Sequence, residues 1–128
     1  MFVKVVGYGW CDPTVARESN DYLLEAAAGY PGRVHAFCSV HPGWGDVALA
    51  EIERCVALGS RGIGELHPTS QGLDLATDPT LDPLMALARQ HRLPVLVHGS
   101  EPVGHAYPGK GTTTPEVLMA FITRYPDN

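Results

Sequence analysis

The chain has 128 residues, of which 45% are hydrophobic and 18% charged, and its formal net charge is −5. This composition is that of one globular domain, and the acidic balance argues against nucleic acid as a partner because phosphate backbones would be repelled. No apolar run reaches the ~20 residues of a membrane-spanning helix, and the odd set of cysteines, without a C-x-x-C pair, does not fit a secreted disulfide scaffold, so we expect a cytoplasmic protein.

Short apolar segments alternate with amphipathic helices along the whole chain. In chain order, the expected strands are residues 2–8, 34–40, 61–66 and 93–98. Ser19 or Asn20 can serve as the N-cap of the first helix, and Pro115 opens the last one. Longer polar loops are expected over residues 67–78 and 99–114. Apolar strands that alternate with amphipathic helices predict an α/β fold with a parallel sheet covered by helices.

Two parallel architectures compete for this pattern. An open doubly wound sheet normally has a G-x-G-x-x-G turn after its first strand, and Gly7 and Gly9 are only a fragment of that motif. A (β/α)8 barrel typically needs ~250 residues. Because the chain opens almost inside a strand and ends after a helix, we expect about four strand–helix units of a longer barrel.

Two residues at the strand ends are candidates for metal binding, since active groups in parallel α/β folds lie at the carboxyl ends of strands. His98 directly follows the fourth strand, and a neutral imidazole is a good zinc ligand. A hydrogen-bonded strand-end histidine is the alternative. Glu65 lies within the third strand, where a carboxylate needs a metal, a cation or a backbone donor; an ion pair is its alternative role.

The polar residues of the two long loops are candidates for substrate binding. They are His67 after the third strand, and Glu101, His105 and Lys110 after the fourth. Lys110 stands between two glycines and can hold a substrate carboxylate. The alternative for each of these side chains is simple solvation on the surface.

The motifs around these residues resemble the amidohydrolase-related family. They are residues 62–68 (GIGELHP), 93–98 (LPVLVH), 100–105 (SEPVGH) and 107–111 (YPGKG), with weaker similarity at 20–24 and 30–33. The resemblance implies a (β/α)8 barrel, to which residues 1–128 contribute strands two to five as a single partial domain that lacks the first strand and the C-terminal units. It also implies a divalent metal, zinc, with His98 as the strand-five ligand and Glu65 at the strand-four position of a bridging ligand.

The resemblance implies a fragment of a metal-dependent hydrolase, in which metal-activated water attacks a carbonyl carbon of a small molecule. A zinc-dependent decarboxylase of an aromatic or unsaturated acid is one alternative, and a non-catalytic half-barrel that pairs with a partner chain or a second copy through its sheet edges is another. A related deoxyribonuclease branch is disfavoured by the negative charge. The family's H-x-H pair, strand-six histidine and strand-eight aspartate are expected outside this chain, which alone is expected to be inactive.

Overall fold

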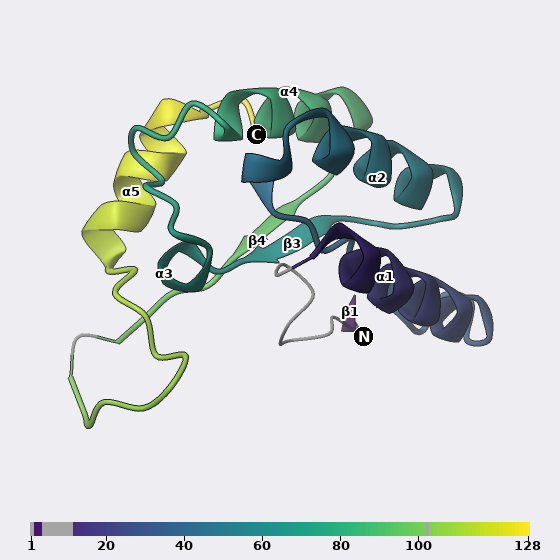
Figure 1. Ribbon diagram of the computed structural model, residues 1–128, viewed down its shortest axis with the longest axis horizontal. Helices are drawn as coiled ribbons and strands as arrows, with labels where there is room; N and C mark the ends of the chain where they lie inside the picture. The colour runs from purple at the N-terminus through teal and green to yellow at the C-terminus, as the bar shows by residue number, and fades with distance from the viewer. Residues whose placement is uncertain (1, 4–11, 102) are drawn as a thin grey trace.

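The computed structural model describes residues 2–3, 12–101 and 103–128, whose helices and strands alternate along the chain (Figure 1). In chain order the elements are β1 (Phe2–Val3), α1 (Pro13–Ala28), β2 (His35–Ala36), the 3-10 helix η2 (Pro42–Trp44), α2 (Asp46–Ala57), β3 (Ile63–Leu66), α3 (Pro68–Gln71), α4 (Leu81–His91), β4 (Val95–Val97) and α5 (Pro115–Arg124). Among the described helices, none is long and apolar enough to cross a membrane.

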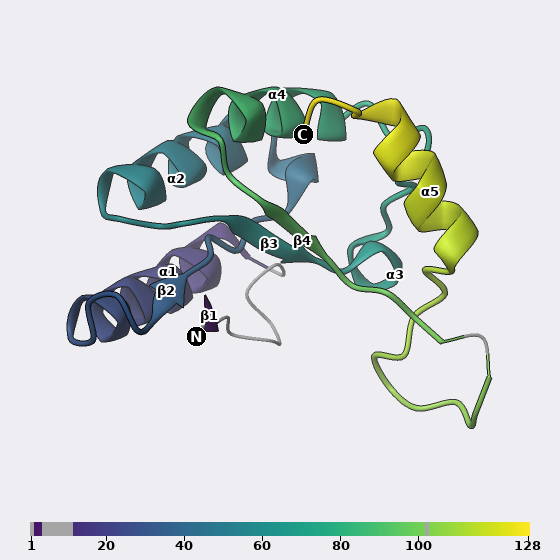
Figure 2. The ribbon, with the colours of Figure 1, turned by 180° about the vertical axis from the view of Figure 1, so that it is seen from behind.

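The strands are parallel, and their order in space follows their order in the sequence. β1 pairs with β2, and β3 pairs with β4 in a register that places Leu66 opposite Val97. A parallel bridge between Cys38 and Ile63 joins the segment after β2 to β3. Helices α1, α2 and α4 are neighbours in the same order, and both views show α2 and α4 along one side of β3 and β4 (Figures 1 and 2).

This arrangement bears on the two architectures that the sequence left open. In a doubly wound sheet the strand order reverses and helices cover both faces. In a barrel, consecutive strands are neighbours and the helices form an outer ring. Over the residues that the structure describes, strand and helix orders both run consecutively. The predicted α/β class with parallel strands is therefore confirmed, and the arrangement is compatible with an arc of a barrel.

The regular strands are shorter than the apolar segments that predicted them. Within residues 34–40, the paired strand covers His35–Ala36, followed by the single bridge at Cys38. The segment predicted as a loop over residues 67–78 contains the short helix α3. Residues 4–8 of the first predicted strand, and Cys11, lie outside the described residues.

The first helix begins well before its predicted start. The Asp12 carboxylate accepts a hydrogen bond of 2.7 Å from the backbone N–H of Thr14, and Pro13 occupies the first turn of α1. The prediction that Ser19 or Asn20 caps this helix is therefore wrong, because the Asp-Pro pair supplies a side-chain acceptor followed by a residue that needs no backbone donor. Asn20 instead lies within α1 and is buried.

The core lies between the helices and one face of the strands. Ala36, Cys38 and Val40 are all buried in it, as expected for every second residue of an extended segment. Phe37, on the other face, covers Gly62, where an added Cβ would stand 2.6 Å from the phenyl ring. Only glycine therefore fits at position 62 while Phe37 keeps its place.

The fourth strand shows that the second face of the sheet is less covered. Val95 and Val97 pack against the core, whereas Leu96 between them is 43% exposed. Successive strand residues point to opposite faces, so Leu96 lies on the face turned away from the helical layer. In a complete barrel this face would be the interior, which side chains from all strands fill.

Candidate functional site

The carboxyl ends of β3 and β4 bring Glu65 and His98 into contact, as expected for neighbouring parallel strands. The Nδ1 atom of His98 lies 3.2 Å from Oε1 of Glu65, and both side chains are partly buried. The backbone extends the pairing of the two strands, because the His98 N–H donates to the Leu66 carbonyl at 2.8 Å. The two residues predicted as metal ligands are therefore neighbours at one edge of the sheet.

The second ring nitrogen of His98 faces a backbone carbonyl. Nε2 lies 3.1 Å from the carbonyl oxygen of Lys110, which also accepts a hydrogen bond from the Ser100 hydroxyl. A carbonyl only accepts hydrogen bonds, so Nε2 must donate to it. A metal ligand instead offers a nitrogen lone pair, so metal binding requires His98 to exchange either this carbonyl or Glu65 for the ion.

His67 supports His98 from one side. The two imidazoles stack with centroids 4.1 Å apart and an interplanar angle of 13°. The Nδ1 atom of His67 accepts from the Ser70 N–H at 3.3 Å, while its Nε2 lies 2.9 Å from the Gly109 carbonyl. One accepting and one donating nitrogen correspond to the neutral ring. The buried His67, predicted as a substrate contact, thus has both ring nitrogens directed at backbone groups.

The remaining predicted substrate residues lie together in the loop after β4. The Lys110 ammonium donates to the carbonyls of Val103 (2.7 Å), Gly104 (3.3 Å) and His105 (3.4 Å). Its Nζ also lies 3.8 Å from a carboxylate oxygen of the exposed Glu101. The three donors of Lys110 are therefore used within the loop, and a substrate carboxylate would have to compete with these carbonyls.

The pair at the sheet edge fits part of a zinc site. Two ligands at about 2.0–2.2 Å from zinc, at a near-tetrahedral angle, stand about 3.4 Å apart, and the His98 nitrogen and Glu65 oxygen are 3.2 Å apart. A closed site needs about four ligands. Within the described residues, no group of three or more His, Cys, Asp or Glu ligands includes this pair. The described residues could thus offer at most part of a ligand set here.

A different group of potential ligands lies in the interior, between the segment after β2 and helices α1 and α2. The ligand atoms of Cys38, Glu51 and Cys55 all lie within 4.8 Å of one another, and all three residues are buried. A hydrogen bond to Cys55, together with burial, raises the pKa of the Cys38 thiol. The Cys38 thiol is therefore expected to be protonated at neutral pH.

Polar partners hold the Glu51 carboxylate in this interior. Asn20 donates to its Oε1 at 2.9 Å, and Arg54 donates to both oxygens at 2.7 and 2.8 Å. Burial raises the pKa of Glu51, but the hydrogen bonds from Arg54, Asn20 and Cys55 together lower it below its usual value. Sequence reasoning missed this cluster because no C-x-x-C pair marks it, although the four-residue spacing of Glu51 and Cys55 places them on one helix face.

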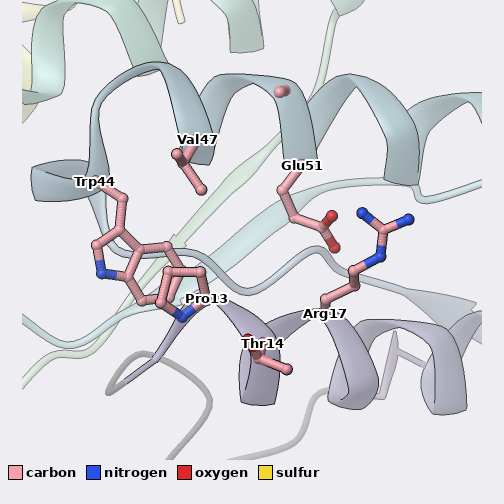
Figure 3. A pocket seen from close by; sticks show the side chains of 7 residues that line it. Pro13, Thr14, Arg17, Trp44, Val47 and Glu51 are labelled. Atoms are coloured by element: carbon pink, nitrogen blue, oxygen red, sulfur yellow. The ribbon is translucent and has the colours of Figure 1, made fainter.

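A pocket of about 340 Å³ opens beside this cluster, between the amino-terminal halves of α1 and α2 (Figure 3). Its lining consists of Pro13, Thr14, Arg17, Trp44, Val47, Ala50 and Glu51. Figure 3 shows the Glu51 carboxylate descending from α2 toward α1, with the exposed Arg17 on the opposite wall. Glu51 thus connects the interior cluster with a solvent-accessible pocket.

Comparison with known proteins gives one match. A family model described as amidohydrolase matches residues 1–128, which is the entire chain. No curated protein and no solved structure matches the chain.

Proposed function

This chain belongs to the amidohydrolase family, and we propose that it is part of a metal-dependent hydrolase that acts on a small molecule. The observation that carries the proposal is the contact between His98 and Glu65 at the carboxyl ends of adjacent parallel strands. Parallel α/β enzymes place their chemistry at this edge. An imidazole and a carboxylate suit zinc, which we propose as the metal.

A divalent metal bound there supplies a Lewis acid and, at neutral pH, an activated water for attack on a carbonyl carbon. The residues of this chain orient the His98 ring before a metal binds: Glu65 contacts one ring nitrogen, the Lys110 carbonyl contacts the other, and His67 stacks on its face. A metal would replace one of the first two contacts. Because the described residues supply a partial ligand set, we propose that the other ligands, and the histidine and aspartate of the catalytic step, come from outside this chain.

The test is metal binding by the full chain. We expect Zn²⁺ titrated into the metal-free chain to bind, with release of heat in calorimetry, and the His98→Ala variant to bind one Zn²⁺ ion fewer per chain. His105→Ala is the matched control, because His105 lies in the loop after β4 and has its ring near Tyr107 rather than His98. Circular dichroism confirms that each variant is folded. An equal number of zinc ions bound per chain in His98→Ala and in the unchanged chain would refute the assignment of His98 as a ligand.

Decarboxylation is the alternative reaction for the same site, with an aromatic or unsaturated acid as substrate. The described geometry gives it less support than hydrolysis, because the Lys110 ammonium already donates to three loop carbonyls. The two reactions are separated by their products once the metal-loaded protein is active. Decarboxylation releases carbon dioxide from the acid, whereas hydrolysis of an amide or ester releases none.

The exposure of Leu96 favours a second candidate function, a half-barrel module that pairs with another copy. Leu96 lies on the sheet face opposite the helical layer and is 43% exposed, and apolar side chains on such a face are stabilised by burial against a partner. Light scattering tests this hypothesis. The hypothesis predicts the mass of a dimer for the unchanged chain and the mass of a monomer for Leu96→Lys. A monomer at high protein concentration would contradict the module and leave the hydrolase proposal intact.

A further inference from the structure

We propose that Cys38, Glu51 and Cys55 form a second metal site, for a thiophilic divalent cation such as Zn²⁺ or Cd²⁺. The site lies in the interior between the segment after β2 and helices α1 and α2. It shares no residue with the sheet edge of His98 and Glu65. The proposal therefore stands independently of the proposed hydrolase function.

The ligand atoms are already close to the separations that such a metal requires. The Cys55 sulfur lies 3.4 Å from the Glu51 Oε1 atom. Around a tetrahedral zinc ion, with metal–sulfur and metal–oxygen distances of about 2.3 and 2.1 Å, a sulfur and an oxygen stand about 3.6 Å apart and two sulfurs about 3.8 Å. Since all the ligand atoms lie within 4.8 Å of one another, shifts of about 1 Å or less bring the set to these separations.

The charge of the interior is unchanged when the cation binds. The Cys38 and Cys55 thiols each lose a proton to solvent as their sulfurs bond to the metal, so two protons leave for one divalent ion. No uncompensated charge is therefore added to a buried region, where it would be costly. The Arg54 guanidinium, which now pairs with Glu51, keeps a second partner in Asp21 at 2.6 Å.

Outer partners orient the ligands, as they do in established metal sites. The Asn20 amide nitrogen lies 2.9 Å from Oε1 of Glu51 and 3.6 Å from the Cys38 sulfur, so it contacts two of the three ligands. Its own oxygen accepts from the Ser39 N–H at 2.9 Å, which fixes the direction of the amide. Asn20 is itself buried, so this orientation is maintained by the core.

The pocket in Figure 3 gives a cation a path to the interior, because Glu51 is part of its wall. A metal site of this kind needs such an entry. Arg17 also lines the pocket and is exposed, so its positive charge opposes the approach of a cation. We therefore expect Arg17→Ala to accelerate cation binding without changing its stoichiometry.

The experiment titrates Cd²⁺ into the reduced full chain with Cys11→Ser as the background, so that Cys38 and Cys55 are the only thiols. Ultraviolet absorption from thiolate-to-cadmium charge transfer reports bonds to sulfur. We expect one sulfur-bound ion per chain, an absorption band that Cys38→Ser and Cys55→Ser each diminish, and an unchanged band in His98→Ala. Glu51→Gln is expected to weaken binding by roughly 30-fold or more, because loss of even a supporting partner typically costs about 10–100-fold in metal affinity.

Thermal unfolding gives a second readout that does not depend on the cysteine variants folding. A ligand that binds only the folded chain raises its melting temperature, so Cd²⁺ is expected to raise it in the Cys11→Ser background and in His98→Ala. Absence of the charge-transfer band, a band of full intensity in Cys55→Ser, or an unchanged melting temperature overturns the proposal. Loss of the band in His98→Ala alone also overturns it, because the ion would then be at the sheet edge.

Discussion

Replacement of Gly111 by alanine tests whether the loop after β4 holds the histidine pair in place. Gly111 has a φ of +73°, and an added Cβ would stand 2.9 Å from the Ser100 hydroxyl, 3.2 Å from the Thr69 hydroxyl and 3.3 Å from Cε1 of His67. The distance of 2.9 Å requires the Ser100 side chain to shift. The substitution therefore combines an unfavourable backbone conformation with crowding directly against His67.

The backbone conformation of residue 111 alone sets a lower bound on the cost of this substitution. A left-handed conformation costs a non-glycine residue about 1–2 kcal/mol, which corresponds to a roughly 5–30-fold change in an equilibrium ratio. The equilibrium ratio of the loop conformation described above to conformations that release the two histidines is expected to fall by at least this factor in Gly111→Ala. Gly109→Ala is the matched control, because Gly109 has a φ of +88° but no atom within 4 Å of its added Cβ.

The assay is proton NMR of the histidine rings, whose stacking at 4.1 Å shifts the resonances of both His67 and His98. Gly111→Ala is expected to move both sets of resonances toward the values of unstacked rings, and Gly109→Ala to move them less. The His67→Gln and His98→Gln spectra assign the signals. Unchanged resonances in Gly111→Ala, or equal changes in the two variants, would show that crowding at position 111 does not control the pair.

Three further substitutions test the core and its polar supports. Ile52 is fully buried, so Ile52→Ala is expected to lower the free energy of unfolding in urea by about 2–5 kcal/mol, whereas Leu58→Ala on the exposed side of the same region should change it by less than about 0.5 kcal/mol. Asn20→Ala leaves buried backbone groups without partners and should cost about 1–3 kcal/mol in the same assay. Burial, and then the hydrogen bond to Asp82, raise the pKa of Tyr125. The stability that comes from keeping the Tyr125 hydroxyl protonated is present below its pKa in the unfolded chain, about 10, and is lost as the pH rises above that value. The melting temperature should therefore fall less at alkaline pH in Tyr125→Phe than in the unchanged chain.

The main features of the fold and of the sheet-edge site follow from local sequence signals. Apolar strands that alternate with amphipathic helices require a parallel sheet with helical cover, and parallel strands that are neighbours bring their carboxyl ends together. This reasoning places Glu65 and His98 near each other before any coordinates are known. The contact of 3.2 Å is consistent with that expectation.

The role of the loop side chains was not accessible from the sequence, because it depends on the path of the backbone. Lys110 was predicted as a residue that can hold a substrate carboxylate, and only the structure shows that its ammonium donates to three carbonyls of its own loop. Asn20 was read as a helix cap because asparagine favours that position. Its contacts with Ser39 and Glu51 are 19 and 31 residues away in the chain, and no local pattern reports contacts at such separations.

The backbone of the loop after β4 contacts His98, so its position is expected to depend on which ring nitrogen of His98 binds a metal. If His98 binds a metal through Nε2, the Lys110 carbonyl loses that donor and keeps only the hydroxyl of Ser100. If it binds through Nδ1, the contact with Glu65 changes while the carbonyl contact persists. Movement of the loop on addition of zinc therefore identifies Nε2 as the ligand atom, and a loop that stays in place identifies Nδ1. The Lys110 carbonyl, which orients the metal-free His98 ring, thus distinguishes metal binding through Nε2 from metal binding through Nδ1.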